Sequence, residues 1–206
     1  MSPRETPAPS APPAPGLRER KKLKTRQAIR REAYRLFAEH GYAATTVERI
    51  AGAAEVSPST FFRYFPTKED VVLDDEYAPM VSAALRSRPA GEPVVDAIRH
   101  ALTGSLAGLL DADREELLFR IRLALTVPAI RIRAVEEQLR SQDAVAELIV
   151  ERTGRPLGDL EVRCAAAAIT AVFATVVRHW AEGGGAGDLA RLYDRQLSLL
   201  AHGLRV

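Results

Sequence analysis

The chain has 206 residues, of which 47% are hydrophobic and 27% are charged, with a net charge of +2 and a single cysteine, Cys164. This composition is ordinary for a globular protein of one large or two smaller domains. One cysteine excludes an internal disulfide and any multi-cysteine metal site. The sequence shows no apolar run approaching the ~18 residues of a membrane span and no signal-peptide pattern, so we expect a cytoplasmic protein without a membrane partner.

Residues 1–16 are rich in Pro, Ala and Ser and lack large apolar residues, which predicts a disordered tail. The periodicity then becomes helical and stays so. A first helix is expected from Leu17 or Arg20 to His40, with Gly41 as its stop. Its apolar face should comprise Ile29, Ala33, Leu36 and Phe37.

Positive charge is concentrated in this first helix. Residues 18–35 hold nine basic side chains against two acidic ones, Glu19 and Glu32. The asymmetry indicates that the front of the protein meets a polyanion, although a charge run taken in isolation favours a solvated helix face.

Two short helices should follow. The first is expected at residues 47–54, capped by Thr46 or by the competing Thr45. The second should follow its N-cap, Ser57, and end near residues 65–66. Two short helices joined by a tight turn after a longer supporting helix form a helix-turn-helix unit.

The aromatic run near position 61 has a packing interpretation. Phe61 and Phe65, four residues apart, should share the inner face of the third helix, and Arg63 and Ser59 should lie on the opposite side. The residues expected at the borders are Thr60, Phe62 and Tyr64.

Beyond residue 67 the pattern predicts a larger helical domain. Thr67 should cap a fourth helix, with Pro79 kinking or interrupting the pattern that follows. Further helices are expected at 94–110, 113–125, 128–152, 160–182 and 188–201. The helix at 160–182 is apolar nearly all round, so we expect it to be buried on most sides together with Cys164, and residues 183–187 should form a flexible linker.

No catalytic constellation is present in the sequence. The four histidines lack metal-ligand spacing, and the glycine loop lacks the Lys-Ser/Thr of a phosphate cradle. We therefore expect no enzyme activity, no metal and no cofactor.

A DNA-binding interpretation fits the basic first helix, the helix-turn-helix and Lys68 better. Basic side chains neutralise phosphates and release counterions, and a recognition helix enters the major groove through its N-terminal part. Arg63 is long enough to reach guanine O6 and N7, and a phosphate contact is the alternative.

The segment TTVERIAGAAEVSPSTFFRYFPTKEDVV resembles the DNA-binding region of the tetracycline-repressor (TetR) family, over about residues 20–73. The resemblance implies an all-α homodimer of about nine helices, with a helix-turn-helix domain (17–66) and a helical bundle for ligand binding and dimerisation (67–206). It also implies repression at a near-palindromic operator.

Roles carried over from the family divide the DNA-binding residues into three groups. Thr46 and Thr60 would contact phosphates, and Tyr64 and Lys68 would clamp them. The residues expected at or in the groove are Ser57, Pro58, Ser59 and Arg63. Two positions depart from the family: Glu55 stands where a turn glycine is common, and Phe62 stands where tyrosine is common, so its role would be packing or contact with the sugar-phosphate backbone.

Two further sets of residues are expected in the C-terminal domain. Residues expected to line a pocket for a small apolar or amphipathic effector are Phe119, Arg120, Arg122, Leu123, Thr126, Phe173, Val177 and His179. Residues expected at a dimer interface formed by the last two helices are Trp180, Leu189, Leu192, Tyr193, Gln196, Leu197 and Leu200. Intramolecular core is the alternative for several of these, and a helical bundle without DNA function is the alternative for the whole chain.

Overall fold

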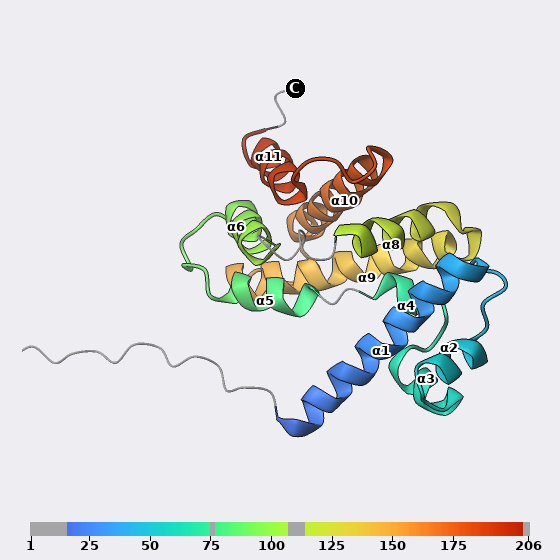
Figure 1. Ribbon diagram of the computed structural model, residues 1–206. Helices are drawn as coiled ribbons and strands as arrows, with labels where there is room; N and C mark the ends of the chain where they lie inside the picture. The colour runs from blue at the N-terminus through green and yellow to red at the C-terminus, as the bar shows by residue number, and fades with distance from the viewer. Residues whose placement is uncertain (1–15, 75–76, 107–113, 204–206) are drawn as a thin grey trace, which may run out of the picture. The chain divides into compact units, whose positions relative to one another are not determined.

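The computed structural model describes residues 16–74, 77–106 and 114–203, and all regular structure in these ranges is helical (Figure 1). This confirms the predicted all-α class. The chain divides into two compact units, one ending at Tyr64 and the other beginning at Phe65. The predicted N-terminal tail lies, except for Gly16, outside the described residues.

The N-terminal unit is built from α1 (Leu17–His40), α2 (Val47–Ala53) and α3 (Pro58–Tyr64), and α2 packs against both α1 and α3 (Figure 1). Its buried side chains include all four predicted for the first helix, together with Ile50, Ala51 and Phe61. Arg30, counted above among the basic side chains, is only 4% exposed because it follows Ile29 on the packed side of α1. It is therefore part of the packed interior.

The two threonines before α2 have different roles. The Thr46 hydroxyl oxygen accepts a hydrogen bond from the Arg49 backbone N–H at 3.3 Å, which makes Thr46 the N-cap. Thr45 is buried, and its hydroxyl lies 3.2 Å from the Leu36 carbonyl oxygen and 2.9 Å from that of Gly41. Thr45 therefore ties the end of α1 to the start of α2.

The turn between α2 and α3 contains the unusual residue Glu55. Its φ of 55° is left-handed, a conformation that costs a residue with a Cβ roughly 1 kcal/mol. The turn is closed by hydrogen bonds from the Glu55 N–H to the Gly52 carbonyl at 3.2 Å and from the Val56 N–H to the Ala51 carbonyl at 2.9 Å. These bonds fix the start of α3 relative to α2.

The C-terminal unit is a helical bundle around one core. Its described helices are α4 (Asp70–Leu73), α5 (Ala78–Arg86), α6 (Val94–Leu106), α8 (Arg114–Thr126), α9 (Pro128–Thr153), α10 (Leu160–Glu182) and α11 (Leu189–Ala201). α10 packs against α8, α9 and α11, and α6 packs against α5 and α11. Pro79 interrupts the helical pattern as predicted and lies in the first turn of α5.

Three predicted boundaries need comment. α3 ends at Tyr64, one residue before the predicted end, and α4 begins at Asp70, later than a helix capped by Thr67 should begin. Thr67 and Asp70 still bond reciprocally: the Thr67 N–H donates to Asp70 Oδ2 at 2.9 Å, and the Asp70 N–H donates to the Thr67 hydroxyl oxygen at 3.3 Å. The predicted end of α6 at residue 110 and start of α8 at residue 113 lie outside the described residues.

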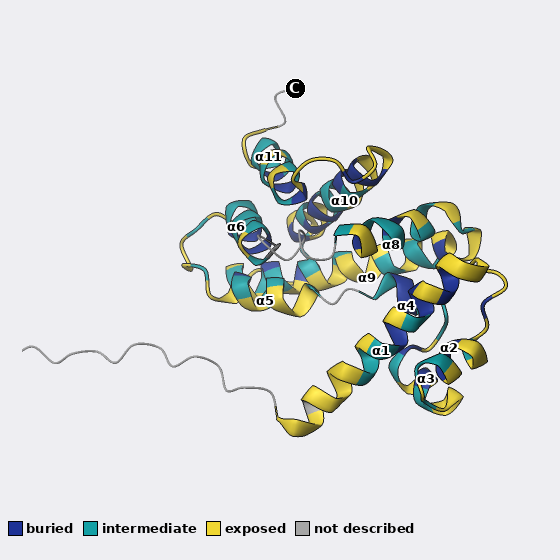
Figure 2. Cartoon of the chain, in the orientation of Figure 1, coloured by how far each residue is buried: buried dark blue, intermediate teal, exposed yellow. Residues whose placement is uncertain are grey.

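The burial of α10 differs from the prediction. One side of the helix is in the core, through Val162, Ile169 and Trp180 among others, but Cys164 and Ala171 are exposed (Figure 2). α10 also has the length and composition of a membrane span, which the sequence analysis did not anticipate, and only 28% of its most apolar window is buried. Because its outward side carries small residues that no described neighbour covers, α10 is a half-buried helix.

Candidate nucleic-acid interface and C-terminal binding region

α3 is held by its inner side and offers its outer side to solvent. Phe61 is fully buried and packs edge-to-face on Phe62, with ring centroids 5.6 Å apart. Ser57, Pro58, Ser59, Phe62 and Arg63 are exposed, whereas Thr60 and Tyr64 are half-buried. The periodicity therefore assigned the two sides of α3 correctly.

Three hydroxyl groups gather at the first turn of α3. The Ser57 hydroxyl oxygen accepts from the Thr60 N–H at 3.1 Å, which confirms Ser57 as the N-cap. It also lies 2.8 Å from the Ser59 hydroxyl and 3.0 Å from the Thr60 hydroxyl. With Pro58 beside them, these short side chains let a nucleic-acid backbone or groove approach the helix end closely.

Arg63 extends from the outer side of α3 and forms no ion pair with any residue that the structure describes. Its guanidinium carbon lies 5.6 Å from the centroid of the Tyr64 ring, a cation–π contact that orients the side chain. All five of its N–H groups point to a fork that suits guanine or phosphate.

Thr46, Phe62 and Lys68 occupy different settings. Thr46 is exposed at the start of α2, and Phe62 is 49% exposed, an unusual position for a phenylalanine in a small domain. Lys68 belongs to the C-terminal unit and is half-buried. Partial burial lowers the pKa of its ammonium group, and the Glu69 carboxylate opposes this shift.

The charge on α1 changes character along the helix. In the turns up to Lys24 every described side chain is exposed (Figure 2), and Lys21, Lys22 and Lys24 form no ion pair with described residues. Further along, Arg35 pairs with Glu32 at 2.9 Å and with Glu39 at 2.8 Å. The cations at the start of α1 are therefore balanced by no described carboxylate.

The residues predicted to bind an effector are spread over α8 and α10. Phe119, Arg120, Leu123, Phe173 and Val177 are half-buried, whereas Arg122, Thr126 and His179 are exposed. An Arg120 N–H donates to the Asp74 carbonyl at 3.2 Å, and the Phe173 ring packs edge-to-face on Tyr193 at 5.6 Å. These contacts direct the two side chains to α4 and α11.

The predicted dimer residues separate by burial. Trp180, Leu189, Tyr193 and Leu197 are at most 6% exposed and belong to the core of the C-terminal unit, which assigns them to the intramolecular alternative. The reason is that this side of α11 packs against α6 and α10. Leu192, Gln196 and Leu200 are half-buried.

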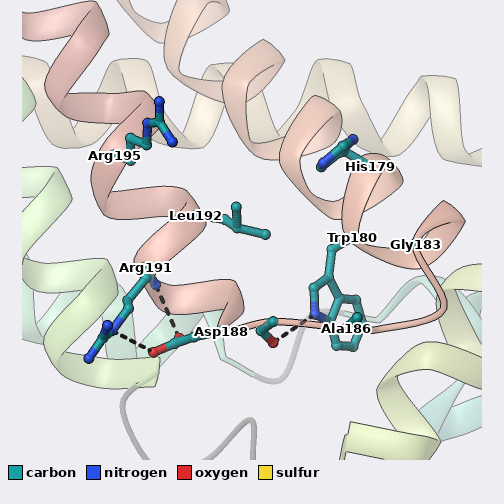
Figure 3. A pocket seen from close by; sticks show the side chains of 9 residues that line it. His179, Trp180, Gly183, Ala186, Asp188, Arg191, Leu192 and Arg195 are labelled. Carbon is teal, nitrogen blue, oxygen red and sulfur yellow. Dashed lines mark hydrogen bonds and ion pairs between the residues drawn. The ribbon is translucent and has the colours of Figure 1, made fainter.

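A hollow of about 440 Å³ lies where α10 ends and α11 begins (Figure 3). Of the eight predicted effector residues, only His179 lines it. The lining residues are His179, Trp180, Gly183, Ala186, Gly187, Asp188, Arg191, Leu192 and Arg195. The sequence did not single out Arg191 and Arg195, although their spacing of four residues on an amphipathic helix places them on one side.

The glycine loop beside this hollow is pinned, contrary to the prediction of a flexible linker. Arg114 donates from its two terminal nitrogens to the carbonyl oxygens of Gly185 at 2.7 Å and Gly187 at 3.1 Å. The Trp180 indole N–H also donates to the Gly187 carbonyl, at 3.4 Å. Gly185 has a φ of 77°, and a Cβ there would lie 3.1 Å from the Leu118 side chain, so the residue is constrained by both backbone and space.

Comparison with known proteins identifies the class. Residues 29–74 match the tetR family of bacterial regulatory proteins, and residues 92–205 match the MftR C-terminal domain. The chain is 37% identical to the HTH-type transcriptional regulator TcmR of Streptomyces glaucescens, over 83% of this chain and 79% of that protein. It is 29% identical to the HTH-type transcriptional repressor AcnR of Corynebacterium diphtheriae, over 82% of this chain and 87% of that protein.

Among solved structures, the TetR-family transcriptional repressor FadR of Thermus thermophilus, in complex with lauroyl-CoA, has a TM-score of 0.59 and 30% identity, covering 88% of this chain and 95% of that one. The chain therefore belongs to the tetR family of bacterial regulatory proteins, which confirms the resemblance. It is a sequence-specific, ligand-responsive DNA-binding transcriptional regulator of the repressor type.

Proposed function

We propose that this regulator binds a near-palindromic operator as a homodimer and represses transcription until a small apolar or amphipathic effector releases it. The observation that carries the proposal is the outer side of α3, where the hydroxyls of Ser57, Ser59 and Thr60 and the guanidinium of Arg63 are offered to solvent on a helix held by Phe61. Such a helix end fits a major groove.

Residue roles follow from these positions. Ser57, Pro58, Ser59 and Arg63 read or line the groove, with Arg63 directed to a guanine. The phosphate contacts come from Thr46, Thr60, Tyr64 and Lys68, and Phe62 packs against the sugar-phosphate backbone. The DNA-binding domain in this proposal comprises residues 17–66, and residues 67–206 serve ligand binding and dimerisation.

The exposed cations at the start of α1 add phosphate contacts. Lys21, Lys22 and Lys24 precede the family match, which begins at residue 29, and no described carboxylate neutralises them. Each phosphate that they neutralise adds about 0.9 to the slope of log K against log salt concentration, without regard to sequence.

The outward side of α10 supports a homodimer. Its exposed residues are small, and the helix begins with Leu160, which is 73% exposed, after a loop in which Leu157 is 51% exposed. The exposed small side chains on this side are Cys164, Ala171, Ala174 and Thr175. A second copy packing the same side against it would cover this surface by two-fold symmetry, with Leu192, Gln196 and Leu200 of α11 at its edge.

An amphipathic effector is supported by the relative that binds lauroyl-CoA. The half-buried side chains of α8 and α10, led by Phe119, Leu123, Phe173 and Val177, supply the apolar contacts of the proposed pocket. The ligand would favour a spacing of the two recognition helices that no longer fits the groove. Under this proposal the protein works in the cytoplasm without a metal, a cofactor or an enzymatic step.

Fluorescence anisotropy with DNA from the protein's own upstream region tests the proposal. We expect tight binding, a steep salt dependence and a clear preference over random DNA. Equal, weak binding to both DNAs would contradict the proposal and favour a helical bundle without DNA function.

A triple variant, Lys21→Ala, Lys22→Ala and Lys24→Ala, tests the start of α1 in the same assay. It should reduce the salt slope on both DNAs by the same amount, since phosphate contacts carry no sequence information. The matched triple Lys→Arg variant keeps the charge and should keep the slope.

A further inference from the structure

We infer that the hollow between α10 and α11 binds a small anion that carries a compact apolar body, such as a medium-chain carboxylate. This inference goes beyond the proposed function, since it needs neither DNA nor the effector residues of α8. It rests on charge, shape and preorganisation within the C-terminal unit (Figure 3).

The charge around the hollow is unbalanced toward the positive. His179, Arg191 and Arg195 face a single lining carboxylate, Asp188. That carboxylate caps α11, accepting from the Arg191 N–H at 3.1 Å, and pairs with the Arg191 side chain at 3.3 Å. His179 and Arg195 form no hydrogen bond or ion pair with any residue that the structure describes, so they are available to an anion.

The Arg191–Asp188 pair does not withdraw Arg191 from this site. The Arg191 side chain is 89% exposed and that of Asp188 is 54% exposed. Ion pairs this exposed contribute little, because water screens both charges. Arg191 can therefore turn to a ligand carboxylate, and Arg195, four residues on, lies on the same side of α11.

The apolar part of the site is formed by Trp180 and Leu192. Figure 3 shows Leu192 between the two helices, with His179 on α10 and Arg195 on α11. The glycine loop contributes little side-chain bulk, which leaves room for a ligand body. A hollow of about 440 Å³ lies within the range of small-molecule sites.

The walls of the hollow are fixed before a ligand arrives. Arg114 holds two carbonyls of the glycine loop, and the Trp180 indole N–H holds one of them from the other side. Gly185 admits no side chain without displacing Leu118. A preformed wall lowers the ordering cost of binding, which favours a specific site over a loose surface patch.

Trp180 is the only tryptophan in the chain, so its fluorescence reports on this site directly. Titration of the full-length protein with octanoate should give a saturable change in Trp180 emission, and the neutral analogue 1-octanol should require at least about tenfold higher concentration. The double variant Arg191→Gln/Arg195→Gln should weaken octanoate binding by about tenfold or more. Ion-pair hydrogen bonds to a carboxylate account for a loss of this size.

Arg178→Gln is the matched control, because Arg178 is an exposed arginine next to His179 on α10 that does not line the hollow. It should bind octanoate like the wild type, and unchanged thermal unfolding should show that all variants are folded. The inference is overturned if octanoate leaves Trp180 emission unchanged, if 1-octanol binds equally well, or if the double variant binds octanoate with wild-type affinity.

Discussion

The N-terminal and C-terminal units carry their functional information in different forms. In the N-terminal unit a residue's role follows from its immediate neighbours: Ser57 caps a helix, Phe61 anchors it and Arg63 extends from it. In the C-terminal unit the binding features come from residues far apart in sequence, as when Arg114 holds Gly185. The comparison teaches that local patterns suffice for a recognition helix and fail for a ligand site.

The largest expected effect separates the two adjacent phenylalanines of α3. Phe61→Ala should lower the free energy of unfolding by about 3–5 kcal/mol, because it empties a fully buried position in a small core. Phe62→Ala should cost less than about 1 kcal/mol, because Phe62 is 49% exposed. Urea unfolding followed by circular dichroism measures both. Equal losses would show that α3 is not anchored on one side.

The glycine loop tests whether the C-terminal unit depends on distant contacts. Gly185→Ala should destabilise by about 1–3 kcal/mol, because it adds a close contact with Leu118 to the strain of a positive φ. Gly184→Ala has a similar φ of 73° but open space around the added Cβ, so it should cost only about 1 kcal/mol. Thermal unfolding followed by Trp180 fluorescence compares them. A loss no greater for Gly185→Ala than for Gly184→Ala would mean that the loop is not packed as described.

The turn before the recognition helix offers a gain in stability. Glu55→Gly should raise the free energy of unfolding by roughly 0.5–1 kcal/mol, because glycine adopts a φ of 55° without a Cβ penalty. Glu48→Gly, inside α2, should instead lower it by about 1 kcal/mol. A stability loss for Glu55→Gly in urea unfolding would contradict the left-handed turn.

The smallest expected effect concerns acid stability of the C-terminal unit. Two hydrogen bonds from Arg88, at 2.7 and 2.6 Å, and one contact with His100 at 2.6 Å lower the pKa of Glu92 from 4.5 to about 2. A lowered pKa in the folded state means that the ionised form stabilises the protein above pH 4.5, and that this contribution is lost as the pH falls from 4.5 toward 2.

Glu92→Gln should therefore lower the melting temperature near pH 7 and flatten its decline between pH 4.5 and 2. The matched control is Glu147→Gln, since Glu147 is exposed and has no described partner. If Glu92→Gln and Glu147→Gln give the same acid limb, the Glu92 cluster does not stabilise the fold.

The sequence predicted most of the N-terminal unit because its signals are local. Caps, a proline at the first helical position and apolar spacing gave the ends of α1 and α3 to within one residue. The choice between Thr45 and Thr46 as the cap of α2 stayed open, since both have the required hydroxyl. Only the buried contacts of Thr45 with α1 decide it.

In the C-terminal unit the sequence predicted helices but not their surroundings. The apolar composition of α10 suggested burial on most sides, yet composition does not say how many neighbours a helix has, and Cys164 is exposed. The glycines at 183–187 suggested flexibility, because the arginine that pins them lies about 70 positions earlier in the chain. Arg191 and Arg195 acquire a shared site with His179 only when α11 folds back on α10.

The central claim is that α3 reads DNA sequence through Arg63, and one measurement tests it most directly. Anisotropy titrations of wild type and Arg63→Ala on the operator and on random DNA, at matched salt, give the specificity ratio of each protein. The account predicts that Arg63→Ala loses about 1–3 kcal/mol, or roughly 5- to 150-fold, on the operator and little on random DNA. Equal losses on both DNAs would contradict base reading by Arg63 and leave it a phosphate contact.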